Sequence, residues 1–75
     1  MRQIFKTGDR VMITFDSFTT PATVLLASEN GRSLMLGFEA MIGGYVGMMP
    51  VLWSDDFGEF CELVAGRTVK VHEFL

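Results

Sequence analysis

Turn-forming sequences recur at short, regular intervals along this chain. They are rich in Gly, Asn, Asp and Pro, which adopt turn conformations readily, and they occur at residues 7–9, 17–21, 29–31, 43–44, 55–58 and 65–67. The runs between them are short and rich in Val, Ile, Leu, Phe and Thr. Short strands at regular spacing are typical of an all-β barrel or sandwich. We therefore expect five to six short antiparallel strands, at residues 10–15, 22–28, 33–38, 48–53, 59–64 and 68–74.

The side-chain pattern agrees with this division. The first run alternates, so that Val11, Ile13 and Phe15 share one face of a strand. Asn30-Gly31 separates the second and third runs and predicts a tight hairpin, because both residues tolerate positive φ. Residues 39–46 could form one helical turn, but the paired glycines there would each cost a helix roughly 1 kcal/mol. We expect no longer helix.

The strand pattern resembles a small SH3-like barrel at the level of the fold. The resemblance covers most of the chain and implies an all-β fold in one domain, residues 1–75. The segment Gly8-Asp9-Arg10-Val11 is similar to the Gly-Asp-x-Val start of the first strand in many such barrels. The chain lacks the ALYDY-type segment of the SH3 domains that bind proline-rich peptides. Because this fold hosts many functions, it implies none in particular.

The chain holds more apolar residues than its size can hide. Hydrophobic residues make up 49% of it, and 8 further residues are glycine, which together exceed the usual share of roughly 45–50%. A chain this short buries only about 60% of the surface it exposes when unfolded. Some apolar surface should therefore remain exposed on the monomer, and exposed apolar patches usually mark an interface. We expect a homodimer or another protein partner.

Residues 40–53 are the most unusual segment, since they contain no charged residue and are rich in Met and Gly. Methionine adapts its shape at interaction surfaces, and Tyr and Trp are favoured interface anchors. Pro50 suggests an edge strand, because proline cannot donate a ladder hydrogen bond. We therefore predict a partner-binding surface with the anchors Tyr45, Met48, Met49 and Trp53. The alternative is that these residues form the barrel's own core.

Catalytic and metal-binding patterns are weak. Cys61 and His72 are the only cysteine and histidine, so neither an intrachain disulfide nor an ordinary zinc site can form. The two could pair as nucleophile and base if residue 61 lay opposite residue 71 or 72, but a cysteine packed as a small hydrophobe is favoured. The acidic cluster within residues 55–62 is interpreted as a solvated turn. We expect no cofactor, no metal and no enzymatic activity.

The charge balance disfavours polyanionic partners. The formal net charge is −3 and the six basic residues are scattered, whereas nucleic-acid binders usually cluster theirs. A local basic patch at Arg2, Lys6 and Arg10 stays open. No apolar run approaches the length needed to span a membrane, the start resembles no signal peptide, and a lone cysteine fits a reducing compartment. We expect a cytoplasmic protein.

A second resemblance concerns PilZ domains, which are β-barrel receptors for cyclic di-GMP. They carry an R-x-x-x-R motif before a strand, and the chain has Lys6 and Arg10 at this spacing before residues 10–15. They also carry D/N-x-S-x-x-G, and residues 26–31 place Ser28 and Gly31 correctly. Lys6 replaces an arginine and Leu26 replaces the acid or amide, and lysine lacks arginine's planar contact with phosphate. The resemblance implies a ligand site at Lys6, Arg10, Ser28 and Gly31.

Overall fold

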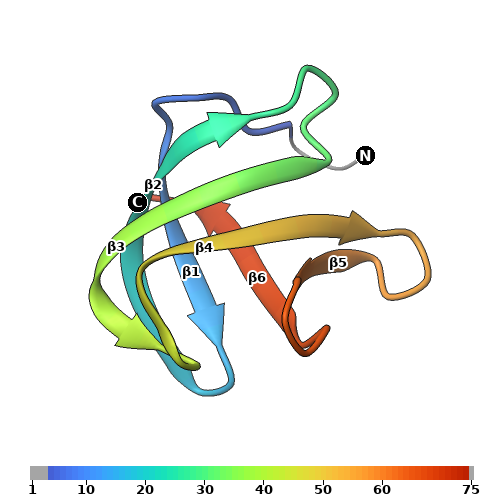
Figure 1. Cartoon of the computed structure of the whole chain (residues 1–75). Coiled ribbons are helices and arrows are strands. Elements are labelled where there is room, and N and C mark those ends of the chain that lie inside the picture. The colour runs from blue at the N-terminus through green and yellow to red at the C-terminus, as the bar shows by residue number, and fades with distance from the viewer. Residues whose placement is uncertain (1–3, 75) are drawn as a thin grey trace.

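Six antiparallel strands follow one another around a closed barrel in the computed structural model, which describes residues 4–74 (Figure 1). The strands are β1 (Arg10–Phe15), β2 (Phe18–Ala27), β3 (Ser33–Ile42), β4 (Tyr45–Ser54), β5 (Glu59–Glu62) and β6 (Thr68–Glu73). Each pairs with the next, and β6 pairs with β1 to close the barrel. The expected fold class, a small all-β barrel of antiparallel strands, is confirmed.

The first strand has the predicted bounds, while β2, β3 and β4 are longer than expected because the turns between strands are tighter. Phe15 pairs with Phe18, so only Asp16 and Ser17 connect β1 to β2. The hairpin between β3 and β4 is equally tight, since Ile42 pairs with Tyr45 across Gly43 and Gly44. Residues 39–46 thus belong to β3, its turn and β4, and the single helical turn that they could have formed is not present.

The two glycines explain why a hairpin forms at this point. Gly43 has φ 57° and Gly44 has φ 89°, and two successive residues of positive φ match the twist of the flanking strands. A Cβ at Gly43 would also lie 2.8 Å from Cζ of Phe15, whereas a Cβ at Gly44 would meet nothing within 4 Å. The paired glycines thus permit a two-residue turn directly against the core.

The core is formed by one face of each strand. Val11, Ile13 and Phe15 point inward, as their alternation predicts, and the other fully buried aliphatic side chains follow the same period of two. The buried hydrophobic residues are Phe5, Val11, Ile13, Phe15, Ala22, Val24, Leu34, Leu36, Phe38, Ile42, Met49, Val51, Phe60 and Val69. They come from all six strands and from the segment before β1, so the barrel interior is filled with side chains.

Pro50 does not mark an edge strand, because β4 pairs with β3 on one side and with β5 on the other. The pairing with β5 runs from Val51↔Glu62 to Ser54↔Glu59, so Pro50 lies one residue beyond it. A proline at this point costs β4 no ladder bond to β5. The prediction that β4 is an edge strand was therefore wrong. Its reason, that proline cannot donate a ladder hydrogen bond, still applies at Pro50, which lies outside the pairing with β5.

Candidate functional site

The four predicted anchors are divided between the core and the surface. Met49 is fully buried, whereas Met48 beside it is 54% exposed. Consecutive strand residues point to opposite sides of a sheet, so the two methionines cannot share a surface. Trp53 is half-buried and packs edge-to-face on Phe60, with ring centroids 5.2 Å apart. Tyr45 is half-buried and packs against the core. Only Met48 stands clearly outward, and Met49 belongs to the core.

Met48 belongs to an apolar surface that the sequence alone did not assemble. On the outer side of the barrel it lies opposite Gly37 of β3, and Pro50 lies opposite Met35. Leu52 lies opposite Cys61 of β5. The side chain of Leu25 covers Gly37 from β2, since a Cβ on Gly37 would lie 2.8 Å from its Cδ1. We name this surface the outer apolar face, composed of Leu25, Met35, Gly37, Met48, Pro50, Leu52 and Cys61.

The outer apolar face has a hollow at its β2–β3 side. A concavity of about 620 Å³ is bordered by Leu25, Gly37 and Gly47 together with residues 20–23 of β2. Arg10 and Glu39, both on its border, bring one positive and one negative charge to its margin. The Leu25 side chain fills the space directly over Gly37, and Met48 projects beside Gly37 from the neighbouring strand.

Trp53 borders a second depression, on another part of the barrel. A groove of about 460 Å³ is lined by Phe5, Trp53, Phe60, Val69 and Val71, with Gly58 at the β4–β5 turn. Its charged or ionisable members are Glu59, Lys70 and His72. The indole Nε1–H of Trp53 donates to Asp55 Oδ1 at 3.0 Å. Of the predicted anchors, Trp53 is thus placed at a different site from Met48.

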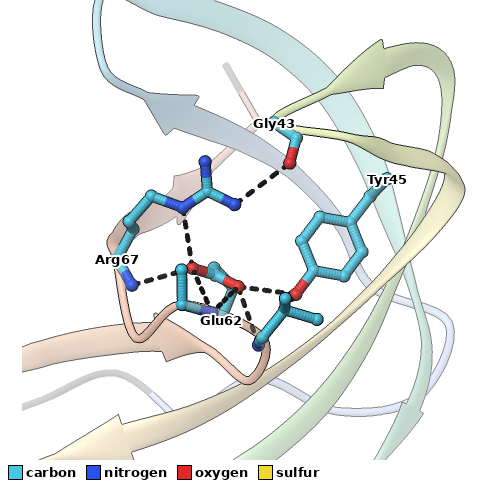
Figure 2. Close-up of polar contacts among 6 residues, drawn as sticks. Gly43, Tyr45, Glu62 and Arg67 are labelled. Carbon is cyan, nitrogen blue, oxygen red and sulfur yellow. Dashed lines mark hydrogen bonds and ion pairs between the residues drawn. The ribbon is translucent and has the colours of Figure 1, made fainter.

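A buried carboxylate, Glu62, is the residue that sequence reasoning placed wrongly. The acidic pattern of residues 55–62 predicts a solvated turn, yet the exposed fraction of Glu62 is 1%. Tyr45 Oη donates to Glu62 Oε1 at 2.6 Å, and Arg67 Nε donates to Oε2 at 2.8 Å (Figure 2). The signal that could have found it is local: Glu62 follows Phe60 by two residues, so an inward Phe60 requires an inward Glu62.

Backbone amides complete the shell around Glu62. The N–H of Val64 donates to Oε1 at 2.9 Å, that of Ala65 to both oxygens, and that of Arg67 to Oε2 at 2.8 Å. The guanidinium of Arg67 also donates to the carbonyl of Gly43 at 3.0 Å (Figure 2). Its Cζ lies over the Phe15 ring, 4.8 Å from the ring centroid. One carboxylate therefore ties the β5–β6 turn to the β3–β4 turn.

The electrostatics of this cluster keep Glu62 ionised. Burial alone would raise the pKa of Glu62, but the hydrogen bonds from Tyr45, Arg67 and the backbone amides outweigh it and hold the pKa well below its ordinary value. Burial, followed by the hydrogen bond to Glu62, raises the pKa of Tyr45. The hydrogen bond to Glu62 likewise raises the pKa of Arg67. Because six hydrogen bonds already engage the carboxylate, we interpret it as a structural group.

The residues of the PilZ-like resemblance lie near one end of the barrel without converging on one depression. Arg10 lies over the Phe74 ring at 5.0 Å. The hydroxyl of Ser28 donates to Asn30 Oδ1 at 2.8 Å and accepts from the N–H of Ser33, so it stabilises its own turn. Gly31 has φ 71° and packs against Ile4. Lys6 is exposed, and Arg2 lies outside the described residues.

Cys61 and His72 are not neighbours. Cys61 lies opposite Thr68, while His72 pairs with Met12 of β1, and its Nε2 is 3.3 Å from Thr14 Oγ1. The pair Phe60↔Val69 centres the hairpin between residues 64 and 65, not on Gly66 as the sequence suggested. At about 3.3 Å per residue, this moves His72 roughly 13 Å along β6 from the position opposite Cys61.

Within residues 4–74, no group of three or more His, Cys, Asp or Glu side chains is arranged to hold a metal ion. The same part of the chain contains no helix of the length and hydropathy that a membrane span requires. Comparison with protein-family models, with curated proteins and with solved structures found no match to this chain.

Proposed function

We propose that this chain is a non-catalytic binding module that self-associates through the outer apolar face. The observation that carries the proposal is the composition of this face: seven residues on β2, β3, β4 and β5, none of them charged, around the exposed Met48. Contiguous exposed apolar surface of this kind is typical of interaction sites. The partner we propose is a second copy of the chain, in a homodimer.

The charge distribution is compatible with a second copy as the partner. In a two-fold dimer each residue faces the same patch on the other subunit, so a charged patch would oppose its own charge. The formal net charge of the chain is −3, so two copies repel each other through most of their surfaces. The outer apolar face avoids this repulsion because it is neutral.

Shape gives independent support. The face carries a projection, Met48, next to the hollow at Gly37. A two-fold axis between them would let Met48 of each copy enter the hollow of the other. Methionine suits this role because its unbranched side chain adapts to an irregular space.

Sedimentation equilibrium at micromolar concentration tests the proposal. We expect the wild-type protein to have twice the 8.4 kDa mass of the chain, and Met48→Lys to sediment as a monomer, because burying an ammonium group in an apolar interface is costly. Val64→Lys is the matched control, since Val64 is 80% exposed but lies on the β5–β6 turn. A monomeric wild type, or a dimeric Met48→Lys variant, would contradict the proposal.

Cys61 offers a second readout, because it is half-buried within the face and is the only cysteine. Its alkylation by iodoacetamide should slow as protein concentration rises and the dimer covers it. The Met48→Lys variant should lose this concentration dependence. The same single cysteine supports placing the module in the cytoplasm.

A PilZ-like receptor for a cyclic dinucleotide is the alternative function. One observation favours it: the segment that runs from Lys6 to the start of β1 at Arg10 packs along the end of β2. Gly8 N–H donates to Val24 O at 2.7 Å, and Ala27 N–H donates to Thr7 Oγ1 at 3.0 Å. This brings the first motif alongside the second. Titration with cyclic di-GMP should then shift the amide resonances around Arg10, and unchanged resonances at millimolar ligand would exclude this function.

A further inference from the structure

We propose that the groove beside Trp53 binds a free α-amino acid with an aromatic side chain. The aromatic side chain would occupy the apolar floor of the groove, while the ammonium and carboxylate groups would meet Glu59 and Lys70 at its rim. The groove shares no lining residue with the outer apolar face. The proposal therefore does not depend on self-association.

The groove lies where β5 and β6 separate. The two strands are paired at Cys61↔Thr68 and Phe60↔Val69, and in Figure 1 β5 meets β6 only near the turn that joins them. The depression of about 460 Å³ lies next to the last of these pairs, since residues 58–60 line one side of it and residues 69–72 line the other. This volume falls within the roughly 300–1,000 Å³ that is usual for small-molecule pockets.

The floor of the groove is apolar and partly aromatic. Phe60 and Val69 are core residues, and Val71 lies on the same face of β6 as Val69. Trp53 is half-buried beside them and packs edge-to-face on Phe60. Aromatic rings prefer edge-to-face and offset contacts with one another. A third ring that enters the groove would extend this contact, which favours an aromatic ligand over an aliphatic one.

The rim of the groove carries one negative and one positive group, on different strands. Glu59 and Lys70 both line the depression. Their side chains belong to the outer side of the barrel, because the adjacent Phe60 and Val69 point inward. Within residues 4–74, neither side chain forms an ion pair or a hydrogen bond with another residue. Both charges are therefore available to a ligand.

A free amino acid is complementary to this arrangement. Its ammonium, its carboxylate and its side chain are attached to one carbon, so a single small molecule can reach both charges and the floor between them. The ammonium would donate to Glu59, and the carboxylate would accept from Lys70. An amine without the carboxylate would bring a second cation toward Lys70, and an acid without the ammonium would bring a second anion toward Glu59. Each would therefore lose an attraction and gain a repulsion.

The probe is L-phenylalanine, titrated to millimolar concentration while the fluorescence of Trp53, the only tryptophan, is followed. We expect a saturable change, because the ligand ring would pack beside the indole. Phenethylamine lacks the carboxylate and hydrocinnamate lacks the ammonium, so each should bind about fivefold more weakly, as expected for the loss of one exposed ion pair. L-Alanine lacks the ring and should produce no change.

Two variants assign each charge of the ligand to its partner. Glu59→Gln should bind L-phenylalanine and hydrocinnamate equally, because the ammonium has lost its acceptor. Lys70→Gln should likewise bind L-phenylalanine and phenethylamine equally, because the carboxylate has lost its donor. Asp56→Asn and Lys6→Gln are the matched controls, since both residues are exposed and neither lines the groove. Both controls should keep the preferences of the wild type.

Three results would each overturn the proposal: no saturable change in fluorescence, equal binding of the three aromatic ligands by the wild type, or unchanged preferences in Glu59→Gln and Lys70→Gln. Binding of L-phenylalanine should persist in Met48→Lys. A dimer that does not bind L-phenylalanine would contradict this proposal alone, and a monomeric wild type that binds it would contradict self-association alone.

Discussion

Tyr45 at the start of β4 donates a 2.6 Å hydrogen bond to Glu62 at the end of β5, and the carboxylate that receives it is almost completely buried. Two turns that are distant in the sequence are joined at this point, because Arg67 bonds Glu62 and the carbonyl of Gly43 at the same time. The contact was not foreseen from either residue. It decides how the end of the barrel is closed and provides the first tests of the structure.

Glu62→Gln should lower the free energy of unfolding by about 3 kcal/mol, the usual cost of removing one partner from a buried ion pair. The amide keeps the volume but directs an NH₂ group at the donors of Tyr45, Arg67 or the backbone. Urea denaturation measures the change. Glu59→Gln is the control on the same strand and should stay within about 0.5 kcal/mol. Equal stability of the two variants would contradict the buried network.

Stability should fall in acid because of Glu62. Its pKa in the folded protein lies below the ordinary value of 4.5, so the unfolded chain binds the proton more readily. The contribution is therefore complete above pH 4.5 and is lost as the pH falls below that value toward the folded pKa. Urea midpoints measured from pH 7 to pH 3 should decline more steeply for the wild type than for Glu62→Gln. Parallel curves would show that Glu62 is not the group responsible.

Tyr45 should produce the opposite dependence in alkali. Its pKa is raised above 10.0 in the folded protein, so its contribution is complete below pH 10 and is lost as the pH rises through the folded value. Absorbance of the phenolate follows this directly, since Tyr45 is the only tyrosine. We expect its titration midpoint to fall toward the ordinary value in Glu62→Gln, because the contribution of Glu62 is lost while that of burial stays. A midpoint that the substitution leaves unchanged would argue against the contact.

The β3–β4 turn can be tested by comparing its two glycines. Both have positive φ, so alanine at either position should cost about 1 kcal/mol in backbone strain. Gly43→Ala should cost more, because its Cβ would press on the Phe15 ring, while Gly44→Ala meets nothing within 4 Å. Thermal unfolding of the two variants measures the difference. A Gly44→Ala variant that is the less stable of the two would refute this packing.

The neighbouring methionines give a comparison within one strand. Met49→Ala should destabilise the barrel by about 2–5 kcal/mol, since it empties a fully buried position. Met48→Ala, measured on the monomer at low concentration, should change stability by less than about 0.5 kcal/mol. Chemical denaturation of both variants would show whether the inward and outward assignments are right.

Much of the architecture could be predicted because its causes are local. The bounds of β1 followed from the alternation of Val11, Ile13 and Phe15, and the turn residues placed all six strands in order. The structure extends β3 and β4 beyond the predicted ranges 33–38 and 48–53. The prediction leaves a wide connection around Gly43-Gly44, whereas two residues of positive φ suffice for a hairpin. The β5–β6 register was missed by several residues for a similar reason, since its turn is not centred on Gly66.

The sequence by itself determined the fold class, since turn chemistry and a period of two act between residues adjacent in the chain. It also determined that apolar surface would exceed what a small barrel can hide. Only the tertiary structure decided where that surface lies. Whether Met48 or Met49 points inward, and whether Glu62 meets Arg67 or water, depends on which face of the sheet curls inward when β6 closes on β1. That closure is a contact between the two ends of the chain, and no local pattern specifies its register.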